Sequence, residues 1–187
     1  MEIGPGKGNI TQLIASKCKY LYCIELDERL RPFLQSLCQK YNNMEVIYGS
    51  ALSVCMPKCN KIITSPPYSI IEPFKHKVLK CYFQELYMII GNHFALNVET
   101  RSVTKLGLFT NCFFHFERIM DINPDSFFPA PRVKSSMIKL MIKKEEEIED
   151  DVLLFFRYLF GLDHKKIKNA LVESFILLAQ SCVKHDD

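Results

Sequence analysis

Apolar and polar positions alternate along the first hundred residues in the order expected for strands followed by helices. Short apolar runs rich in β-forming residues, typical of buried strands, occupy 19–26, 44–49, 60–65 and 86–90. Between them, apolar residues at helical spacing predict helices over 27–41, with Asp27 as its expected cap, 71–83 and 92–101. Strands that alternate with helices indicate a parallel sheet covered on both faces.

The pattern changes after residue 106. Two further strands are predicted over 116–122 and 134–144, joined by a proline-rich loop, and we expect them to pair antiparallel at the edge of the sheet. Beyond an acidic run at 143–151, the remaining chain has helical spacing, interrupted at Gly161. We therefore predict a doubly wound, Rossmann-like α/β domain over residues 1–142 and a small helical domain over 143–187.

Composition narrows the setting in which this fold works. The chain has 187 residues, of which 48% are hydrophobic and 24% charged, the balance of a globular protein. Its eight cysteines form no CxxC pair, which favours small apolar thiols in a reducing compartment over disulfides or zinc. No apolar run is long enough for a membrane span and no leader pattern opens the sequence, so we expect a cytoplasmic protein, nucleolar if eukaryotic.

A glycine-rich turn, "EIGPGKGNIT", opens the chain with glycines at positions 4, 6 and 8. Such a turn between a strand and a helix lets backbone approach a ligand closely, and Glu25 at the end of the next strand is suited to hold ribose hydroxyls. The G-x-G-x-G spacing differs from that of dinucleotide binders and indicates an adenosyl ligand without a pyrophosphate. The simpler alternative is a tight turn followed by a surface acid.

The third and fourth predicted strands end in polar residues at the same edge of the sheet. Ser50 would lie beside the base of the ligand, and "SPPY" begins at Ser65, which we also expect to contact the ligand. The Ser65 hydroxyl and the Pro66 carbonyl can accept hydrogen bonds from a base amine, while Tyr68 offers an aromatic face to a base taken out of its stack. The amine could then attack the methyl group of S-adenosylmethionine, whose sulfonium is a good leaving group. The alternative is a strand that ends at two prolines.

Several motifs together resemble one family. "EIGPGKGNIT", "IELDERL", "SPPYSI", "HFA", "FFPAPRVKSSMIKL" and the late "HKKIKNAL" are similar to the ribosomal RNA adenine dimethyltransferases and their macrolide-resistance relatives, with the late basic segment most like archaeal and eukaryotic members. The resemblance implies that Gly4, Gly6 and Glu25 contact S-adenosylmethionine. It also implies that Tyr68 and Phe127 sandwich a flipped adenine.

The resemblance further implies that the carboxy-terminal helices lie against small-subunit ribosomal RNA in a pre-ribosomal particle, with the chain as a monomer. The basic residues expected at this contact are Arg132, Lys134, Lys165, Lys166 and Lys168. A net charge of +3 does not by itself imply nucleic-acid binding. For the basic segment at 164–170, a solvated helix face is the alternative.

This chain departs from the family pattern at two acceptors. Ser50 stands where the family usually has Asp, and Ser65 where it has Asn; the usual segment before the glycine turn is also missing. The leading interpretation is methylation, with dimethylation expected from the family resemblance, of adenine amines in small-subunit ribosomal RNA by S-adenosylmethionine. A second interpretation is a catalytically inactive RNA-binding ribosome-assembly factor with the same fold. The "TSPPY" motif also suggests a DNA amino-methyltransferase, against which the "FFPAPRVKSS" loop argues.

Overall fold

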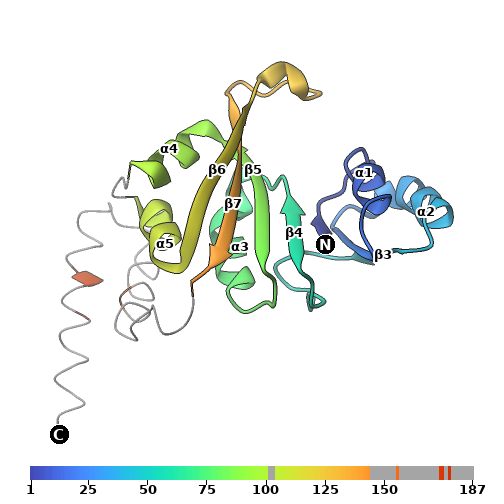
Figure 1. The fold of residues 1–187 in the computed structure, drawn as a ribbon, viewed down its shortest axis with the longest axis horizontal. Helices are drawn as coiled ribbons and strands as arrows, with labels where there is room; N and C mark the ends of the chain where they lie inside the picture. Colours follow the sequence, from blue (N-terminus) through green and yellow to red (C-terminus); the bar gives the residue numbers. More distant parts are fainter. Residues whose placement is uncertain (101–103, 144–154, 156–172, 175–176, 178–187) are drawn as a thin grey trace, which may run out of the picture. The chain divides into compact units, whose positions relative to one another are not determined.

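The computed structural model describes residues 1–100 and 104–143, together with positions 155, 173, 174 and 177. Strands and helices alternate through most of this part (Figure 1). The strands are β1 (Glu2–Ile3), β2 (Leu21–Glu25), β3 (Met44–Tyr48), β4 (Lys61–Thr64), β5 (Glu85–Gly91), β6 (Phe114–Ile122) and β7 (Ser135–Ile142). The α-helices are α1 (Thr11–Ala15), α2 (Arg31–Lys40), α3 (Ile71–Val78), α4 (Asn92–Glu99) and α5 (Lys105–Phe113). Three short 3₁₀ helices, η1 (Glu28–Leu30), η2 (Tyr68–Ile70) and η3 (Pro124–Ser126), complete the set.

Within the described residues, the strands form one seven-stranded sheet in the order β3-β2-β1-β4-β5-β7-β6. Parallel pairing runs from β3 to β5, and β7 pairs antiparallel with β5, Gly91 lying opposite Ser135. The predicted α/β class, the parallel strands and the antiparallel pair at the edge are therefore confirmed. Because β5 and β7 run in opposite directions, the start of β7 lies beside the carboxyl end of β5, at the same edge of the sheet as the carboxyl ends of β1 and β4.

The first two helices are held on the sheet by a small apolar core. Ala15 of α1 and Leu34 of α2 are buried with Leu21, Cys23 and Met44 of the neighbouring strands. Asp27 was predicted to cap the helix that begins after it, but it caps η1 instead, because its side chain accepts a hydrogen bond from the Arg29 amide at 3.0 Å. The α-helix α2 begins four residues after Asp27. A 3₁₀ turn thus takes up the first part of the predicted helix.

The two edge strands form a hairpin whose connecting segment, residues 123–134, lies beyond the ends of the strands at the top of Figure 1. This segment, here called the hairpin loop, begins with η3 and contains a cis peptide bond between Phe128 and Pro129. Its position follows from the antiparallel pairing of β7, which brings the loop to the edge of the sheet where β1 and β4 end.

The chain divides into two compact units. One comprises residues 1–92 and 117–141, and the other residues 93–116 and 142–187. In the second unit, the Asn111 side chain donates to the Val98 carbonyl at 3.1 Å and the Lys143 ammonium donates to the Asn111 carbonyl at 2.8 Å. The predicted helical domain over 143–187 lies almost wholly outside the described residues and stays a prediction.

Candidate cofactor and base site

The turn between β1 and α1 is built from three glycines in the left-handed region. Gly4, Gly6 and Gly8 have φ values of +71°, +60° and +86°, which side chains rarely adopt. Nothing lies within 4 Å of the place where a Cβ would stand on Gly4 or Gly6. A Cβ on Gly8 would lie 2.2 Å from Leu37 Cδ1, so this glycine allows the turn to pack on α2. Two glycines therefore present bare backbone to open space, and the third seats the turn.

Glu25, the last residue of β2, is buried and binds the glycine turn directly. Its Oε2 accepts a hydrogen bond from the Gly6 amide at 3.1 Å, and its Oε1 accepts one from the Asp27 amide at 2.8 Å. An ionised carboxylate offers about four lone-pair sites, of which these contacts use two. Glu25 is not among the residues that line the cavity described next, so its predicted contact with a ligand stays a prediction. The sequence placed this acid beside the glycine turn, and the structure shows the contact that joins them.

A cavity of about 630 Å³ opens beside the turn, a size typical of small-molecule sites. Four separate segments of the chain line it: β1 with the glycine turn, the end of β4, β5 at Ile89 and the hairpin loop. The lining residues include Gly4, Gly6, Asn9, Thr64, Ser65 and Phe128. Thr64 donates its hydroxyl to the Ile3 carbonyl at 3.0 Å, which fixes the end of β4 against β1 and so sets the position of Ser65.

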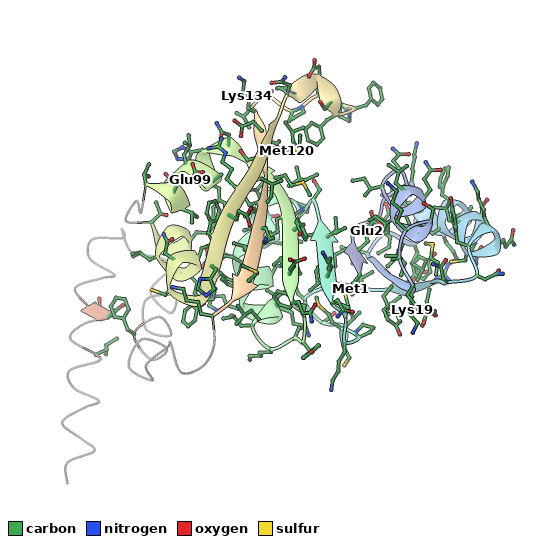
Figure 2. The ribbon with its side chains drawn as sticks, viewed as in Figure 1. Met1, Glu2, Lys19, Glu99, Met120 and Lys134 are labelled. Carbon is green, nitrogen blue, oxygen red and sulfur yellow. The ribbon has the colours of Figure 1, made fainter. Side chains whose placement is uncertain are left out.

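Glu2 also lines the cavity, and its side chain is almost fully buried, with 3% of its surface exposed (Figure 2). Burial raises the pKa of this carboxyl above its usual range, and the negative charge of Glu25 acts in the same direction. The hydroxyl of Thr11 opposes the shift by lowering the pKa. Glu2 therefore places a second carboxyl group beneath the glycine turn, in an environment that disfavours its charged form.

Ser50 follows β3 and caps its own turn. Its Oγ accepts a hydrogen bond from the Leu52 amide at 3.2 Å, and its carbonyl accepts from the Ser53 amide at 2.9 Å. The preceding Gly49 donates its amide to the Glu25 carbonyl at 2.8 Å, which keeps this turn next to the end of β2. Ser50 is absent from the residues that line the cavity, so its predicted contact with the ligand stays a prediction.

The remaining predicted residues fall in several places. Pro66 lies directly after the lining residue Ser65, and Tyr68 begins η2. Phe127 is half-buried and does not line the cavity, whereas its neighbour Phe128 does and is fully exposed. Arg132 and Lys134 are exposed on the hairpin loop. Lys165, Lys166 and Lys168 lie outside the described residues.

Of the lining residues, the sequence singled out Gly4, Gly6 and Ser65 and missed the others, among them Asn9, Thr64 and Phe128. Asn9 and Thr64 lie within the motifs "EIGPGKGNIT" and "TSPPY", so membership of those motifs was the available signal. The exposure of Phe128 could not be read from the sequence, because two consecutive phenylalanines give no indication of which one is buried. In the part of the chain that the structure describes, no three acidic, histidine or cysteine side chains are grouped to hold a metal ion.

Comparison with known proteins supports the interpretation of this geometry. A dimethyladenosine transferase from Plasmodium falciparum superimposes with a TM-score of 0.73 at 25% identity, covering 90% of this chain and 65% of that one. The 23S rRNA methyltransferase ErmE superimposes with a TM-score of 0.70 at 22% identity, covering 92% of this chain and 74% of that one. The fold is thus the Rossmann-like fold of class I S-adenosylmethionine-dependent methyltransferases.

Sequence comparison defines the family. The probable ribosomal RNA small subunit methyltransferase A of Pyrococcus abyssi is 32% identical over 189 residues, which span 98% of this chain and 69% of that protein. The family model for ribosomal RNA adenine dimethylase matches residues 1–180. The chain therefore belongs to the ribosomal RNA adenine dimethylase family, a family of methyltransferases that modify ribosomal RNA. Among the described helices, none has the length and apolar character needed to cross a membrane.

Proposed function

We propose that this chain transfers methyl groups from S-adenosylmethionine to the exocyclic amine of adenine in small-subunit ribosomal RNA. The observation that carries the proposal is the cavity shared by the glycine turn and the end of β4, which brings a site for an adenosyl ligand together with Ser65. Family membership supplies the class of substrate, and similarity to small-subunit methyltransferases supports the small subunit as its source. One and two methyl transfers to each adenine fit the same geometry.

The glycine turn and Glu25 fit an adenosyl cofactor. Bare backbone at Gly4 and Gly6 leaves the space that a Cβ would fill, so a ligand can lie against the turn. Glu25 retains lone pairs that can accept hydrogen bonds from two ribose hydroxyls, while its other two positions hold the turn in place. Bound S-adenosylmethionine would supply an electrophilic methyl group on a positively charged sulfur.

The end of β4 supplies the acceptors for the adenine amine. Hydrogen bonds from the amine to the Ser65 hydroxyl and the Pro66 carbonyl draw its lone pair out of conjugation with the ring, so that the nitrogen can form a bond to the methyl carbon. Pro66 has no amide hydrogen that would compete with the amine for an acceptor. Its ring fixes the φ angle and so restricts the direction of its carbonyl. Tyr68 and Phe127 are proposed to stack on the two faces of the extruded base.

Contacts with RNA outside the cavity are proposed for the hairpin loop and the late basic segment. Arg132 and Lys134 are exposed on the loop that reaches the cavity, so phosphates next to the target adenine can approach them. Lys165, Lys166 and Lys168 would extend the contact. A protein that acts on small-subunit particles would work in the cytoplasm or, in a eukaryote, in the nucleolus, and as a monomer if one copy meets each particle.

One observation favours a second candidate function, an RNA-binding assembly factor without turnover. Ser50 uses its hydroxyl oxygen to cap its own turn, and Ser65 offers one short hydroxyl where the family resemblance leads us to expect a carboxamide. Both differences leave fewer acceptors for cofactor and substrate. A neutral hydrogen bond contributes roughly 0.5–1.5 kcal/mol, so weakening one slows methyl transfer by about tenfold and does not abolish it.

Substitutions at Ser65 distinguish the two functions. We expect Ser65→Ala to lower the single-turnover rate of methyl transfer roughly tenfold, because the amine loses one acceptor, and Ser65→Asn to raise it above that of the parent. Cofactor affinity, measured by calorimetry, should stay the same in both variants. An inactive parent that gains activity with Ser65→Asn would support the assembly factor. Equal rates in all three proteins would refute the role of Ser65.

A further inference from the structure

A polar cluster joins three strands at the base of the hairpin loop. It consists of Asn92, directly after β5, Arg118 and Asp121 on β6, and Ser136 on β7, all within the first compact unit. Lys134, labelled in Figure 2, marks the end of the loop beside this cluster. We name these four side chains the loop anchor.

The hydrogen bonds of the loop anchor converge on two oxygen atoms. Arg118 donates through Nη2 to Asn92 Oδ1 and to Asp121 Oδ1, and through Nε to Asp121 Oδ1 at 3.0 Å. The fully buried Ser136 hydroxyl lies 3.1 Å from Asn92 Oδ1 and 3.0 Å from Asp121 Oδ1. Arg118 thus donates to both acceptors, whereas the single hydroxyl hydrogen of Ser136 lies within reach of either, so displacement of β6 or β7 disturbs several of these contacts together.

Backbone contacts extend the anchor to the loop itself. The Asn92 amide donates to the Lys134 carbonyl at 2.9 Å, and Gly91 pairs with Ser135. The loop therefore leaves β6 one residue after Asp121 and enters β7 beside Asn92. Arg118 lowers the pKa of the Asp121 carboxyl, and the Ser136 hydroxyl acts in the same direction, so Asp121 is held in its charged form.

The position of this cluster matters because the loop carries an aromatic ring into the cavity. Phe128 lines the cavity although none of its own surface is covered, so nothing next to its ring fixes its position. The loop must then be held at its two ends. We propose that the loop anchor holds the hairpin loop in register with the cavity, and that Arg118 is a positioning residue for methyl transfer. The inference rests on the proposed function for its effect on the rate.

A matched ion pair on the same two strands provides the control. Lys139 Nζ of β7 lies 2.7 Å from Glu117 Oε2 of β6. Neither residue belongs to the loop or lines the cavity. If the anchor merely stabilised the hairpin, breaking the Glu117–Lys139 pair would have the same effect as breaking the contacts of Arg118. If Arg118 positions the loop, only the Arg118 substitution should change amide exchange in the hairpin loop.

The experiment compares Arg118→Met, Arg118→Lys and Glu117→Gln with the parent chain by hydrogen exchange, calorimetry and single-turnover methyl transfer. We expect Arg118→Met to speed amide exchange in residues 123–134 about tenfold, because charge-assisted hydrogen bonds at the loop base are lost. Its transfer rate should fall roughly 10-fold to 100-fold, because small misplacements of binding groups have effects of this size. Cofactor affinity should stay within about twofold, as for substitutions that touch no ligand.

Arg118→Lys should recover part of the rate, since it keeps the charge but loses the forked geometry. Glu117→Gln should match the parent in every measurement. Unchanged exchange in Arg118→Met, or an equal acceleration in Glu117→Gln, would overturn the proposal. A parent chain that binds cofactor but transfers no methyl group would refute the proposed function instead, and the exchange data would still decide whether the anchor holds the loop.

Discussion

Gly6 and Gly8 lie two positions apart in the glycine turn and differ in what an added methyl group would meet. Gly6 and Gly8 both have left-handed backbone, so alanine at either position is strained by roughly 1–2 kcal/mol. Only the Gly8 methyl group meets protein, at 2.2 Å from Leu37 Cδ1. Leu37 is half-buried and Cδ1 is the tip of its side chain, so a change of its side-chain conformation relieves the contact at an added cost of about 1 kcal/mol. We therefore expect Gly8→Ala to destabilise the fold by about 2–3 kcal/mol and Gly6→Ala by about 1–2 kcal/mol.

Cofactor binding should respond in the opposite order. The Gly6 methyl group would enter open space on the cavity side of the turn, where the proposed ligand lies. We expect Gly6→Ala to weaken S-adenosylmethionine binding at least tenfold, or about 1.4 kcal/mol. The folded fraction of Gly8→Ala should bind nearly as well as the parent, since its methyl group points to α2.

Urea unfolding measures the first effect and calorimetric titration of the folded protein measures the second. A Leu37→Ala variant provides the control, because shortening this side chain removes the atom that the new methyl group would meet. Gly8→Ala should therefore lower the free energy of unfolding less in the Leu37→Ala background than in the parent, and a double-mutant cycle measures this coupling. Equal destabilisation by Gly6→Ala and Gly8→Ala, or cofactor affinity unchanged in Gly6→Ala, would refute this division of roles.

Three further substitutions test other parts of the site. Glu25→Gln should weaken cofactor binding by about 1.5–3 kcal/mol, the range for hydrogen bonds to a charged group, and calorimetry that shows no loss would contradict the ribose contact. Phe127→Ala should slow methyl transfer through the loss of base stacking worth about 1–3 kcal/mol, whereas Val133→Ala, which shortens an exposed apolar residue of the same loop, should leave the rate unchanged. Burial raises the pKa of Glu2, so the folded state binds a proton at this carboxyl more tightly than the unfolded state does. This proton stabilises the fold below the ordinary pKa of 4.5, and the stabilisation is lost as the pH rises through the folded-state pKa. Glu2→Gln should therefore be more stable than the parent at pH 7, with the difference narrowing towards pH 4.5, and a pH-independent difference in urea unfolding would contradict this explanation.

The sequence predicts most of the sheet because its strands and helices differ in apolar period. The strand ending at Glu25, for example, and the helix after it are both evident, since a run of β-forming residues gives way to apolar residues at helical spacing. The start of that helix is less evident. Asp27 has the chemistry of a cap, but it caps η1, and only the three-dimensional path of the chain decides between a 3₁₀ turn and an α-helical one.

The site is predicted where its chemistry is local and missed where it depends on packing. Glycines 4 and 6 and the acid at Glu25 carry a spacing that the sequence displays, and the structure joins them through one hydrogen bond. The loop anchor has no such spacing, because its members come from β6, β7 and the residue after β5, which meet only through the antiparallel pairing of β7. The path of the hairpin loop also decides which of Phe127 and Phe128 is half-buried and which is exposed, and the sequence does not determine that path.

Methyl transfer to RNA tests the central claim most directly. The chain would be incubated with S-adenosylmethionine labelled in its methyl group and with small-subunit particles that lack adenine methylation, and the RNA would then be digested to nucleosides. The account predicts label in N6-methylated or N6,N6-dimethylated adenosine, and its loss when Glu25 is replaced by Gln. A folded chain that binds the particles and the cofactor yet leaves the adenosines unlabelled would contradict it.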